Sequence, residues 1–436
     1  MTIAFAVSFF DFRNDVRRVI AEVQRHHHVV LLTNRGQLAD IERHAPAGCA
    51  VRLIEERAPG PANRLTRLRY RLRRAIPASE QNFYLMESFK AGRLTGNARR
   101  LAEWTTRLHR LLPASYGYDE YLDDLTYAGN TKLDDIDAFV CFTEIADDYL
   151  MARLVRERRP LVTYVYSWDH ACKHTRFSRR SVNLVWNEDI GQDLVELQHI
   201  PREQIAVIGA SQFCYIHEYR SRRQEFQDRI FDFPYVYFGC AIGIESLVPE
   251  EVEVALSLAD ALRDTRPDLK LVVRPYPPLR NWSLYDRLYA HPTIVMDDDF
   301  RQTDRAVRQE DLMSKFVKLD QAAAFFHLGT TLGLECCFLD TPSFILDVNP
   351  DNGQPVSTYH FTHQYQNEKY LMERAPLNHC RSWDQLRTIL GEVETGRYRE
   401  LNHLVQTGEP LQSFSDFATR LTALAASRNA SPSTAQ

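Results

Sequence analysis

Short apolar runs alternate with helix-forming stretches along this chain, and the alternation occurs in two separate series. The apolar runs of the first series lie at 3–9, 29–33, 51–54, 138–142, 161–166, 182–186 and 205–208. Those of the second lie at 235–239, 269–274, 294–296, 323–327 and 343–348. Strands that alternate with helices usually pair in parallel and are covered by those helices. The sequence therefore predicts an α/β fold with two parallel-sheet domains.

A polar segment separates the two series and sets the predicted domain boundaries. We expect an N-terminal domain at 1–212, a linker at 213–233 that is rich in Arg, Glu and Gln, and a C-terminal domain at 234–395. The stretch 61–113 interrupts the first series and predicts two helices inserted into the N-terminal domain. The remaining residues, 396–436, predict a further helix and a disordered tail of small polar residues.

Composition and charge argue against several other classes of protein. A formal net charge of -5 over 436 residues gives no electrostatic reason to expect a nucleic-acid partner. The eight cysteines form no CxxC pair, so we expect neither a zinc site nor a disulfide framework, and a reducing cytoplasmic location. No run approaches the ~20 apolar residues that span a bilayer, and the first residues do not read as a signal peptide. Any membrane contact is expected to be peripheral.

The segment from His327 to Pro342 gives the strongest indication of a ligand site. An apolar run leads into Gly329, Thr330 and Thr331, and a helical pattern follows. Such a turn can offer backbone N–H groups and the positive end of a helix to a phosphate or diphosphate. Glu335, about one turn inside the helix, can accept hydrogen bonds from ribose hydroxyls. The same residues also fit a simple helix cap at Thr330.

This segment resembles the donor-binding helix of GT-B glycosyltransferases, in which a turn of small or hydroxyl residues precedes a glutamate by one helical turn. Upstream, the sequence LVVRPYP, with Arg274 and Tyr276, resembles a branch that makes bacterial surface polysaccharides and teichoic acids. Members of that branch usually carry histidine where this chain has Tyr276, which puts a catalytic role at that position in doubt. The resemblance implies a donor site made by Arg274, His327, Gly329, Thr330, Thr331 and Glu335. Arg274 suits phosphate because guanidinium pairs with it bidentately, although it also fits an exposed arginine at a strand end.

The N-terminal half resembles the same branch independently. YSWD ends at Asp169, LVWNE ends at Glu188, and IAVIG ends at Gly209, in the order and spacing of those transferases. The chain departs from their pattern at His170, where they carry Asn, and after Phe213, where they carry Asp. The resemblance covers about 161–213 and 236–348.

Three polar residues of these motifs lie at strand ends, where parallel sheets bind ligands. Asp169 or His170 is predicted to remove the proton from the attacking acceptor hydroxyl, and Glu188 is predicted to bind substrate. Asp169 also fits a turn cap after Trp168, with His170 as its partner in that turn.

The segment 63–74 reads NRLTRLRYRLRR, with six arginines and no acidic residue. Leu65, Leu68, Leu72 and Ile76 fall on one face of a helix. Basic amphipathic helices lie on anionic membranes, so peripheral membrane contact through 63–74 is one prediction. The alternatives are an acidic acceptor, or a helix packed on its domain with a solvated arginine face.

Two apparent metal motifs are interpreted otherwise. His26 to His28 has no second ligand cluster nearby in the sequence, and Asp297 to Asp299 follows a strand and reads as a polar strand end. No Walker A or GxGxxG sequence is present, which argues against an ATPase or a dehydrogenase.

These features together predict a GT-B enzyme with two Rossmann-like domains facing a cleft. Its expected reaction is metal-independent transfer of a sugar from a nucleotide-activated donor to a glycan or lipid-linked acceptor in cell-envelope polysaccharide synthesis, with no cofactor. Two alternatives stay open: a CDP-glycerol or CDP-ribitol type polyol-phosphate transferase, and a non-catalytic GT-B-like protein that binds a glycan or nucleotide.

Overall fold

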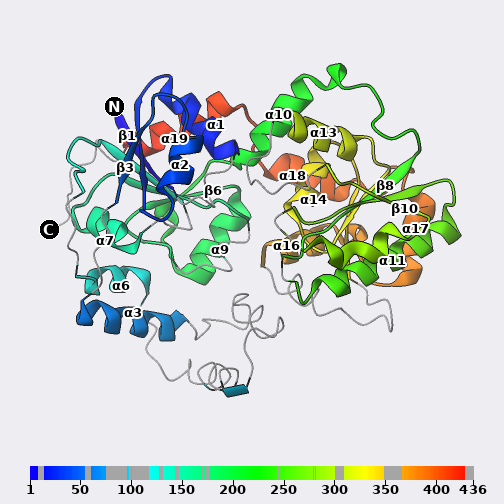
Figure 1. Cartoon of the computed structure of the whole chain (residues 1–436), viewed down its shortest axis with the longest axis horizontal. Coiled ribbons are helices and arrows are strands. Elements are labelled where there is room, and N and C mark those ends of the chain that lie inside the picture. Colours follow the sequence, from blue (N-terminus) through cyan, green and yellow to red (C-terminus); the bar gives the residue numbers. More distant parts are fainter. Residues whose placement is uncertain are drawn as a thin grey trace. The chain divides into compact units, whose positions relative to one another are not determined.

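The computed structural model forms two compact units (Figure 1). It describes residues 1–7, 14–54, 60–74, 96–97, 100, 104, 117–126, 131–142, 147–168, 171, 176–243, 245–277, 279, 281–299, 309–347 and 366–427. Unit 1 runs to Tyr215 and takes up the chain again at Pro410, whereas unit 2 spans Ile216–Glu409. The α/β prediction with two parallel sheets is confirmed, because each unit is built on one such sheet.

Unit 1 contains a seven-stranded parallel sheet in the order β3-β2-β1-β4-β5-β6-β7. Its strands are β1 (Thr2–Ala6), β2 (His28–Thr33), β3 (Ala50–Leu53), β4 (Ala138–Phe142), β5 (Leu161–Tyr164), β6 (Val182–Val185) and β7 (Ile205–Val207). The central strands are apolar on both faces because helices cover both, and every residue of β4 and β5 is buried.

The helices of unit 1 come from both ends of the chain. They are α1 (Asn14–Gln24), α2 (Leu38–His44), α3 (Pro61–Arg74), α6 (Tyr118–Asp124), α7 (Asp148–Arg156), α9 (Glu188–Gln198) and α19 (Phe414–Ser427). In α1, the buried residues Val16, Val19, Ile20 and Val23 recur at helical spacing. That helix packs against α19, which also covers β4 and β5 (Figure 1).

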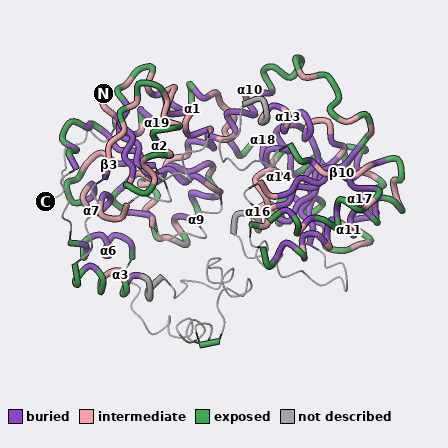
Figure 2. The backbone as a smooth tube through the Cα atoms, in the orientation of Figure 1, coloured by how far each residue is buried: buried purple, intermediate pink, exposed green. Residues whose placement is uncertain are grey.

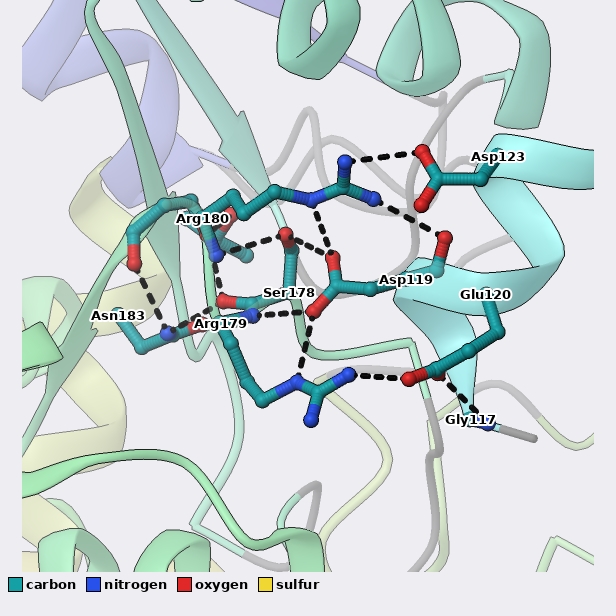
Figure 3. A network of polar contacts seen from close by, with 10 residues as sticks. Gly117, Asp119, Glu120, Asp123, Ser178, Arg179, Arg180 and Asn183 are labelled. Atoms are coloured by element: carbon teal, nitrogen blue, oxygen red, sulfur yellow. Dashed lines mark hydrogen bonds and ion pairs between the residues drawn. The ribbon is translucent and has the colours of Figure 1, made fainter. Parts of the chain in front are cut away.

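Helix α6 joins the α3 region to the rest of unit 1. It packs against both α3 and α7. The buried carboxylate of Asp119 fixes α6 to the loop before β6 (Figure 3). It accepts hydrogen bonds from Ser178 Oγ at 2.6 Å and the Arg179 backbone N–H at 2.9 Å, and the Nε groups of Arg179 and Arg180 each lie 3.2 Å from it. A carboxylate satisfied by this many donors is a rigid anchor.

Unit 2 contains a six-stranded parallel sheet in the order β10-β9-β8-β11-β12-β13. Its strands are β8 (Tyr235–Gly239), β9 (Lys270–Arg274), β10 (Ile294–Met296), β11 (Phe325–His327), β12 (Ser343–Leu346) and β13 (His379–Cys380). Its helices are α11 (Val248–Thr265), α12 (Asp286–Tyr289), α13 (Gln309–Asp320), α14 (Thr331–Phe338), α16 (Gln366–Arg374), α17 (Trp383–Glu392) and α18 (Glu400–Gly408). Burial is concentrated in the strands of both sheets (Figure 2).

The structure differs from the sequence interpretation in two connecting regions. The predicted linker 213–233 contains a further helix, α10 (Cys214–Ser221), whose Tyr215 and Tyr219 are buried. The predicted C-terminal segment 396–436 is divided, since α18 belongs to unit 2 and α19 to unit 1. Of the two helices predicted within 61–113, α3 is described, and the second lies largely outside the described residues.

Candidate functional site

The order of strands in unit 2 defines one position where the chain direction across the sheet reverses. Strands β8 and β11 are neighbours, but β8 leads to β9 on one side and β11 leads to β12 on the other. In doubly wound sheets, ligands bind outside the carboxyl ends of the strands at this reversal point. The loops after Gly239 and after His327 are therefore the expected site of ligand contact in unit 2.

Gly239 allows these two strands to pack closely at their carboxyl ends. A Cβ atom at position 239 would lie 2.6 Å from Cζ of Phe325 and 3.3 Å from Cδ1 of Leu332. Any larger residue would therefore separate β8 from β11 at the point where the two loops begin.

His327 organises the turn between β11 and α14. Its ring is buried, and its Nδ1 accepts hydrogen bonds from the backbone N–H groups of Gly329 at 2.9 Å and Thr330 at 3.2 Å. Burial lowers the pKa of His327 to about 3, so the ring is neutral. Because Nδ1 is the acceptor, the proton is on Nε2. That side of the ring lies against Gly333, where an added Cβ would overlap Nε2.

Only some of the groups that the sequence predicts for phosphate binding are left available in this turn. Two of the backbone N–H groups expected to face a ligand, those of Gly329 and Thr330, are directed at His327 instead. Thr330 caps α14, with its Oγ1 3.5 Å from the Leu332 N–H. The described residues provide no acceptor for the Thr331 N–H, which lies in the partly exposed first turn of α14. Anion binding here would therefore rely on this N–H, the threonine hydroxyls and neighbouring cations.

Glu335 forms a buried ion pair with Lys315 of α13. Lys315 Nζ lies 2.6 Å from Glu335 Oε2, and the two side chains are 8% and 6% exposed. Burial lowers the pKa of the Lys315 amine, and the nearby carboxylate of Glu335 opposes that shift. Sequence reasoning missed Lys315, since lysines on helices are usually exposed. The pair fixes one oxygen of the carboxylate that the sequence predicts for ribose.

Arg274 ends β9 and lies opposite Gly239 of β8 in the sheet register. The residue is 7% exposed, and its carbonyl accepts a hydrogen bond from the Cys240 N–H at 2.9 Å. The positive charge of its side chain adds to the lowering of the Lys315 pKa, after burial. The sequence alternative of an exposed strand-end arginine is therefore wrong.

A second buried lysine of α13 neutralises the acidic end of β10. Lys318 lies 2.6 Å from Asp297 Oδ1 and also contacts Asp299, while the Tyr237 hydroxyl donates to Asp297. The remaining carboxylate, Asp298, accepts a hydrogen bond from Tyr289 at 2.7 Å. In the described part of the chain, no three His, Cys, Asp or Glu side chains are grouped so as to hold a metal ion.

Glu251 of α11 holds the loop after β8 through a hydrogen bond. This carboxyl group is fully buried and accepts a hydrogen bond from the Ala241 N–H at 2.7 Å. Burial raises the pKa of Glu251 to about 8. Tyr276 packs on the same loop, since a Cβ at Gly243 would lie 2.9 Å from its ring. Tyr276 thus contacts the loop at the reversal point.

The predicted N-terminal site is only partly within the described residues. Asp169 and His170 lie outside them. Just before them, the hydroxyl of buried Tyr166 donates to Asp15 Oδ1 at 3.1 Å, and Ser211 Oγ donates to Asp15 Oδ2 at 2.6 Å. These bonds join the start of α1 to the segments after β5 and β7.

Glu188 is the first residue of α9, at the surface. Its side chain is 71% exposed and pairs with Arg202, which is 51% exposed. Arg274, His327, Thr330, Thr331 and Glu335 all belong to unit 2, at the ends of β9 and β11 and in α14 and its N-terminal cap. Glu188 belongs to unit 1.

Comparisons with known proteins find similar structures, but only at low sequence identity. No protein-family model matches it, and no curated sequence matches it. Its structure is similar to a UDP-GlcNAc 2-epimerase from Methanocaldococcus jannaschii, with 10% identity, a TM-score of 0.49 and coverage of 97% of this chain and 98% of that chain. A glycosyltransferase from Rickettsia africae gives 10% identity, a TM-score of 0.47 and 99% coverage of both chains.

The calicheamicin glycosyltransferase CalG4 is also similar, with 13% identity, a TM-score of 0.49 and 99% coverage of both chains. We base the fold assignment on the two sheets and the site on its own residues, because similarities at this level do not distinguish one activity from another.

Proposed function

We propose that this chain is a GT-B transferase that moves a sugar from a nucleotide-activated donor, bound by unit 2, to a glycan or lipid-linked acceptor. The observation that carries the proposal is the group at the reversal point of unit 2. A neutral His327 shapes the turn into α14, Glu335 of α14 pairs with Lys315, and the buried Arg274 ends β9 at the same edge of the sheet. These are the kinds of groups that bind a diphosphate and a ribose.

In this proposal, Arg274 and the N-terminal turn of α14 hold the donor diphosphate. The Thr331 N–H and the hydroxyls of Thr330 and Thr331 donate to phosphate oxygens, and the guanidinium supplies a fixed positive charge. When the bond from the anomeric carbon to the diphosphate breaks, negative charge develops on the leaving oxygen. Groups already oriented toward that charge stabilise it without reorganising.

Glu335 is proposed to accept hydrogen bonds from the ribose hydroxyls. Lys315 already occupies Oε2 at 2.6 Å, which limits the rotation of the carboxylate and compensates its charge in a buried position. Lys315 is therefore a positioning residue in this account. Its loss would leave an uncompensated carboxylate beneath the donor.

The acceptor is proposed to react from unit 1, where Asp169 or His170 removes the proton of the attacking hydroxyl. The support is their place in the sequence, a few residues after the end of β5, since parallel sheets bind ligands where their strands end. The sequence resemblance supports a role in cell-envelope polysaccharide synthesis, the cysteines support a cytoplasmic location, and the arginine-rich segment 63–74 supports contact at the membrane periphery. No helix within the described residues is long and apolar enough to cross a bilayer.

A thermal-shift screen against UDP, GDP, CDP, CMP and dTDP tests the donor site. A ligand present at 100 times its dissociation constant stabilises the fold by about 2.7 kcal/mol. We expect one nucleoside diphosphate to raise the melting temperature of the parent and to do so far less for Arg274→Gln. If no nucleotide in this series shifts the parent, unit 2 is not a nucleotide-binding domain of the proposed kind.

A further inference from the structure

Helix α3 is attached to unit 1 by its polar face. Asn63 exchanges two hydrogen bonds of 2.8 Å with the backbone N–H and carbonyl of Thr126. One turn later, the Arg67 guanidinium lies 4.9 Å from the centre of the Tyr149 ring. Tyr70 is buried and stacks on Tyr121, with ring centres 4.2 Å apart and planes 8° from parallel. Residues 63, 67 and 70 share one side of a helix.

Two leucines of α3, Leu65 and Leu68, face away from the domain. Leu65 is 69% exposed and Leu68 is 53% exposed, and they lie three residues apart on the same side. Trp104, also in the inserted stretch 61–113, is 59% exposed. The helix packs on its domain, as one of the sequence alternatives has it, through Asn63 and Tyr70, while Leu65 and Leu68 stay exposed.

Charge is distributed unevenly along the sequence. The stretch 61–113 holds eleven arginines and one lysine against three glutamates, a net charge of +9. The whole chain carries -5, so the remaining residues carry -14. The described side chains include Arg64, which is exposed, and Arg69, which is 65% exposed and lies 3.3 Å from Asp124. An anionic surface would attract the insertion and repel the rest of the molecule.

We propose that the outer face of α3 docks on an anionic lipid surface, with Leu65 and Leu68 in the headgroup–acyl boundary and the flanking arginines against lipid phosphates. Exposed leucines flanked by arginines on a helix are the features that place such helices in this interface. An anionic polysaccharide would pair with the arginines but would leave both leucines in water. If the proposed function is correct, docking brings the enzyme to the surface that holds a lipid-linked acceptor. The docking itself does not depend on transferase activity.

Vesicle co-sedimentation of the full chain tests this docking. The probes are vesicles of phosphatidylcholine with phosphatidylglycerol, vesicles of phosphatidylcholine alone, and soluble dextran sulfate as a polyanion without an apolar phase. The variants are Leu65→Gln combined with Leu68→Gln, Arg64→Gln alone, and the control Leu377→Gln, which changes a leucine of unit 2 that is 38% exposed. Leu65 and Leu68 are exposed, so their replacement is expected to leave the fold intact, which a thermal melt checks.

We expect the parent to bind the phosphatidylglycerol vesicles and not the neutral ones. The double leucine variant should lose binding by about tenfold or more, because each leucine leaves an apolar environment. Arg64→Gln should bind the charged vesicles about fivefold more weakly, because one basic residue near the surface contributes about 1 kcal/mol. Leu377→Gln should bind as the parent does, and nucleotide thermal shifts should be unchanged throughout, so that failure of docking and failure of the donor site remain distinct.

Three results would overturn the proposal. The parent does not sediment with phosphatidylglycerol vesicles, or it binds neutral vesicles equally well, or the double leucine variant binds the charged vesicles as tightly as the parent. The third result, together with tight binding of dextran sulfate, would identify the arginines as a site for an acidic glycan.

Discussion

The two units have the same order of strands, but they differ in the polar contacts found at the carboxyl ends of those strands. Numbered within each unit, both sheets run 3-2-1-4-5-6, and unit 1 adds a seventh strand. In unit 2, α13 inserts Lys315 and Lys318 into the interior, where they meet Glu335 and Asp297. At the corresponding edge of unit 1, the hydroxyl groups of Tyr166 and Ser211 donate hydrogen bonds to the carboxylate of Asp15.

This contrast indicates different tasks for a common scaffold. Buried ion pairs cost desolvation energy and do not stabilise a fold more than apolar packing would. Among the described residues, such pairs occur at the carboxyl edge of unit 2 and not at that of unit 1, a difference that ligand charge explains better than stability. In the proposed function, unit 2 binds the nucleotide donor and unit 1 binds the acceptor.

The largest expected effect concerns the dependence of unit 1 on the C-terminus. Truncation after Glu409 removes α19, whose buried residues are Phe414, Phe417, Ala418, Leu421, Thr422 and Ala425. Each large apolar side chain contributes about 1.5–3 kcal/mol by burial, and whole domains are stable by only about 5–15 kcal/mol. Hydrogen exchange should show unit 1 unprotected and unit 2 protected.

The matched control for this truncation ends the chain after Ser427 and keeps α19 whole. It should exchange as the parent does. Equal protection of unit 1 in the parent and in the chain ending at Glu409 would show that unit 1 is complete without α19.

A smaller loss is expected when one buried cation of unit 2 is removed. Lys318→Met leaves Asp297 buried without its cation, which typically costs about 3–5 kcal/mol. Adding Asp297→Asn should recover much of this loss. The control in unit 1, Arg202→Gln, breaks an exposed pair with Glu188 and should cost well under about 1 kcal/mol. Urea unfolding measures all three, and comparable losses at the two sites would remove the contrast between the units.

The sequence predicted the strands better than the connections between them. Ala138–Phe142, Tyr235–Gly239 and Ile294–Met296 are strands with the predicted bounds, because each is a short apolar run. Polar residues flank the first and the third, and Pro234 precedes the second. Local periodicity cannot show which sheet a late helix covers, so the packing of α19 on α1 was not predicted. β13 was also missed, because two residues carry no periodic pattern.

The candidate site was predicted in part. The turn at Gly329–Thr331 and its capping threonine followed from residue types that local chemistry favours at helix starts. The use of His327 as acceptor for that turn depends on ring orientation, which a sequence does not give. One sequence feature could have predicted that the lysines of α13 are buried. Their neighbours in the sequence are apolar and predict a helix that is buried on most sides: Met313, Phe316, Val317 and Leu319.

Unit 1 also holds a buried acid without a partner, and this predicts a pH effect. Asp193 of α9 is fully buried, and neither carboxylate oxygen has a hydrogen-bond partner among the described residues. Burial raises the pKa of Asp193 to about 8, and Asp189 and Glu196 add to the shift. The folded chain therefore keeps a proton that the unfolded chain releases near its ordinary pKa, so stability falls as pH rises toward about 8.

Asp193→Asn should abolish this dependence. Its melting temperature should exceed that of the parent by an amount that grows between about pH 5 and pH 9. Glu203→Gln, an exposed change next to the same helix, is the control and should track the parent. A gain for Asp193→Asn that is constant with pH would point to packing rather than to protonation.

The smallest expected effect is that of a chelator. Asp297 and Asp299 are held by Lys318, and Asp298 by Tyr289, so the acidic run is already engaged. Transfer activity should persist in EDTA. Loss of activity that Mg²⁺ or Mn²⁺ restores would reassign these carboxylates as metal ligands and revise the role of unit 2.

Calorimetric titration of the nucleoside diphosphate selected by the screen tests the donor site most directly. The account predicts that Glu335→Ala weakens affinity roughly tenfold to a hundredfold, the value of about 1.5–3 kcal/mol for a hydrogen bond to a charged group. Glu392→Ala, which removes an exposed carboxylate of unit 2 paired with Arg397, should leave the affinity unchanged. Equal affinities for the parent and Glu335→Ala, with both proteins folded, would contradict the placement of the nucleotide at the β8–β11 reversal point.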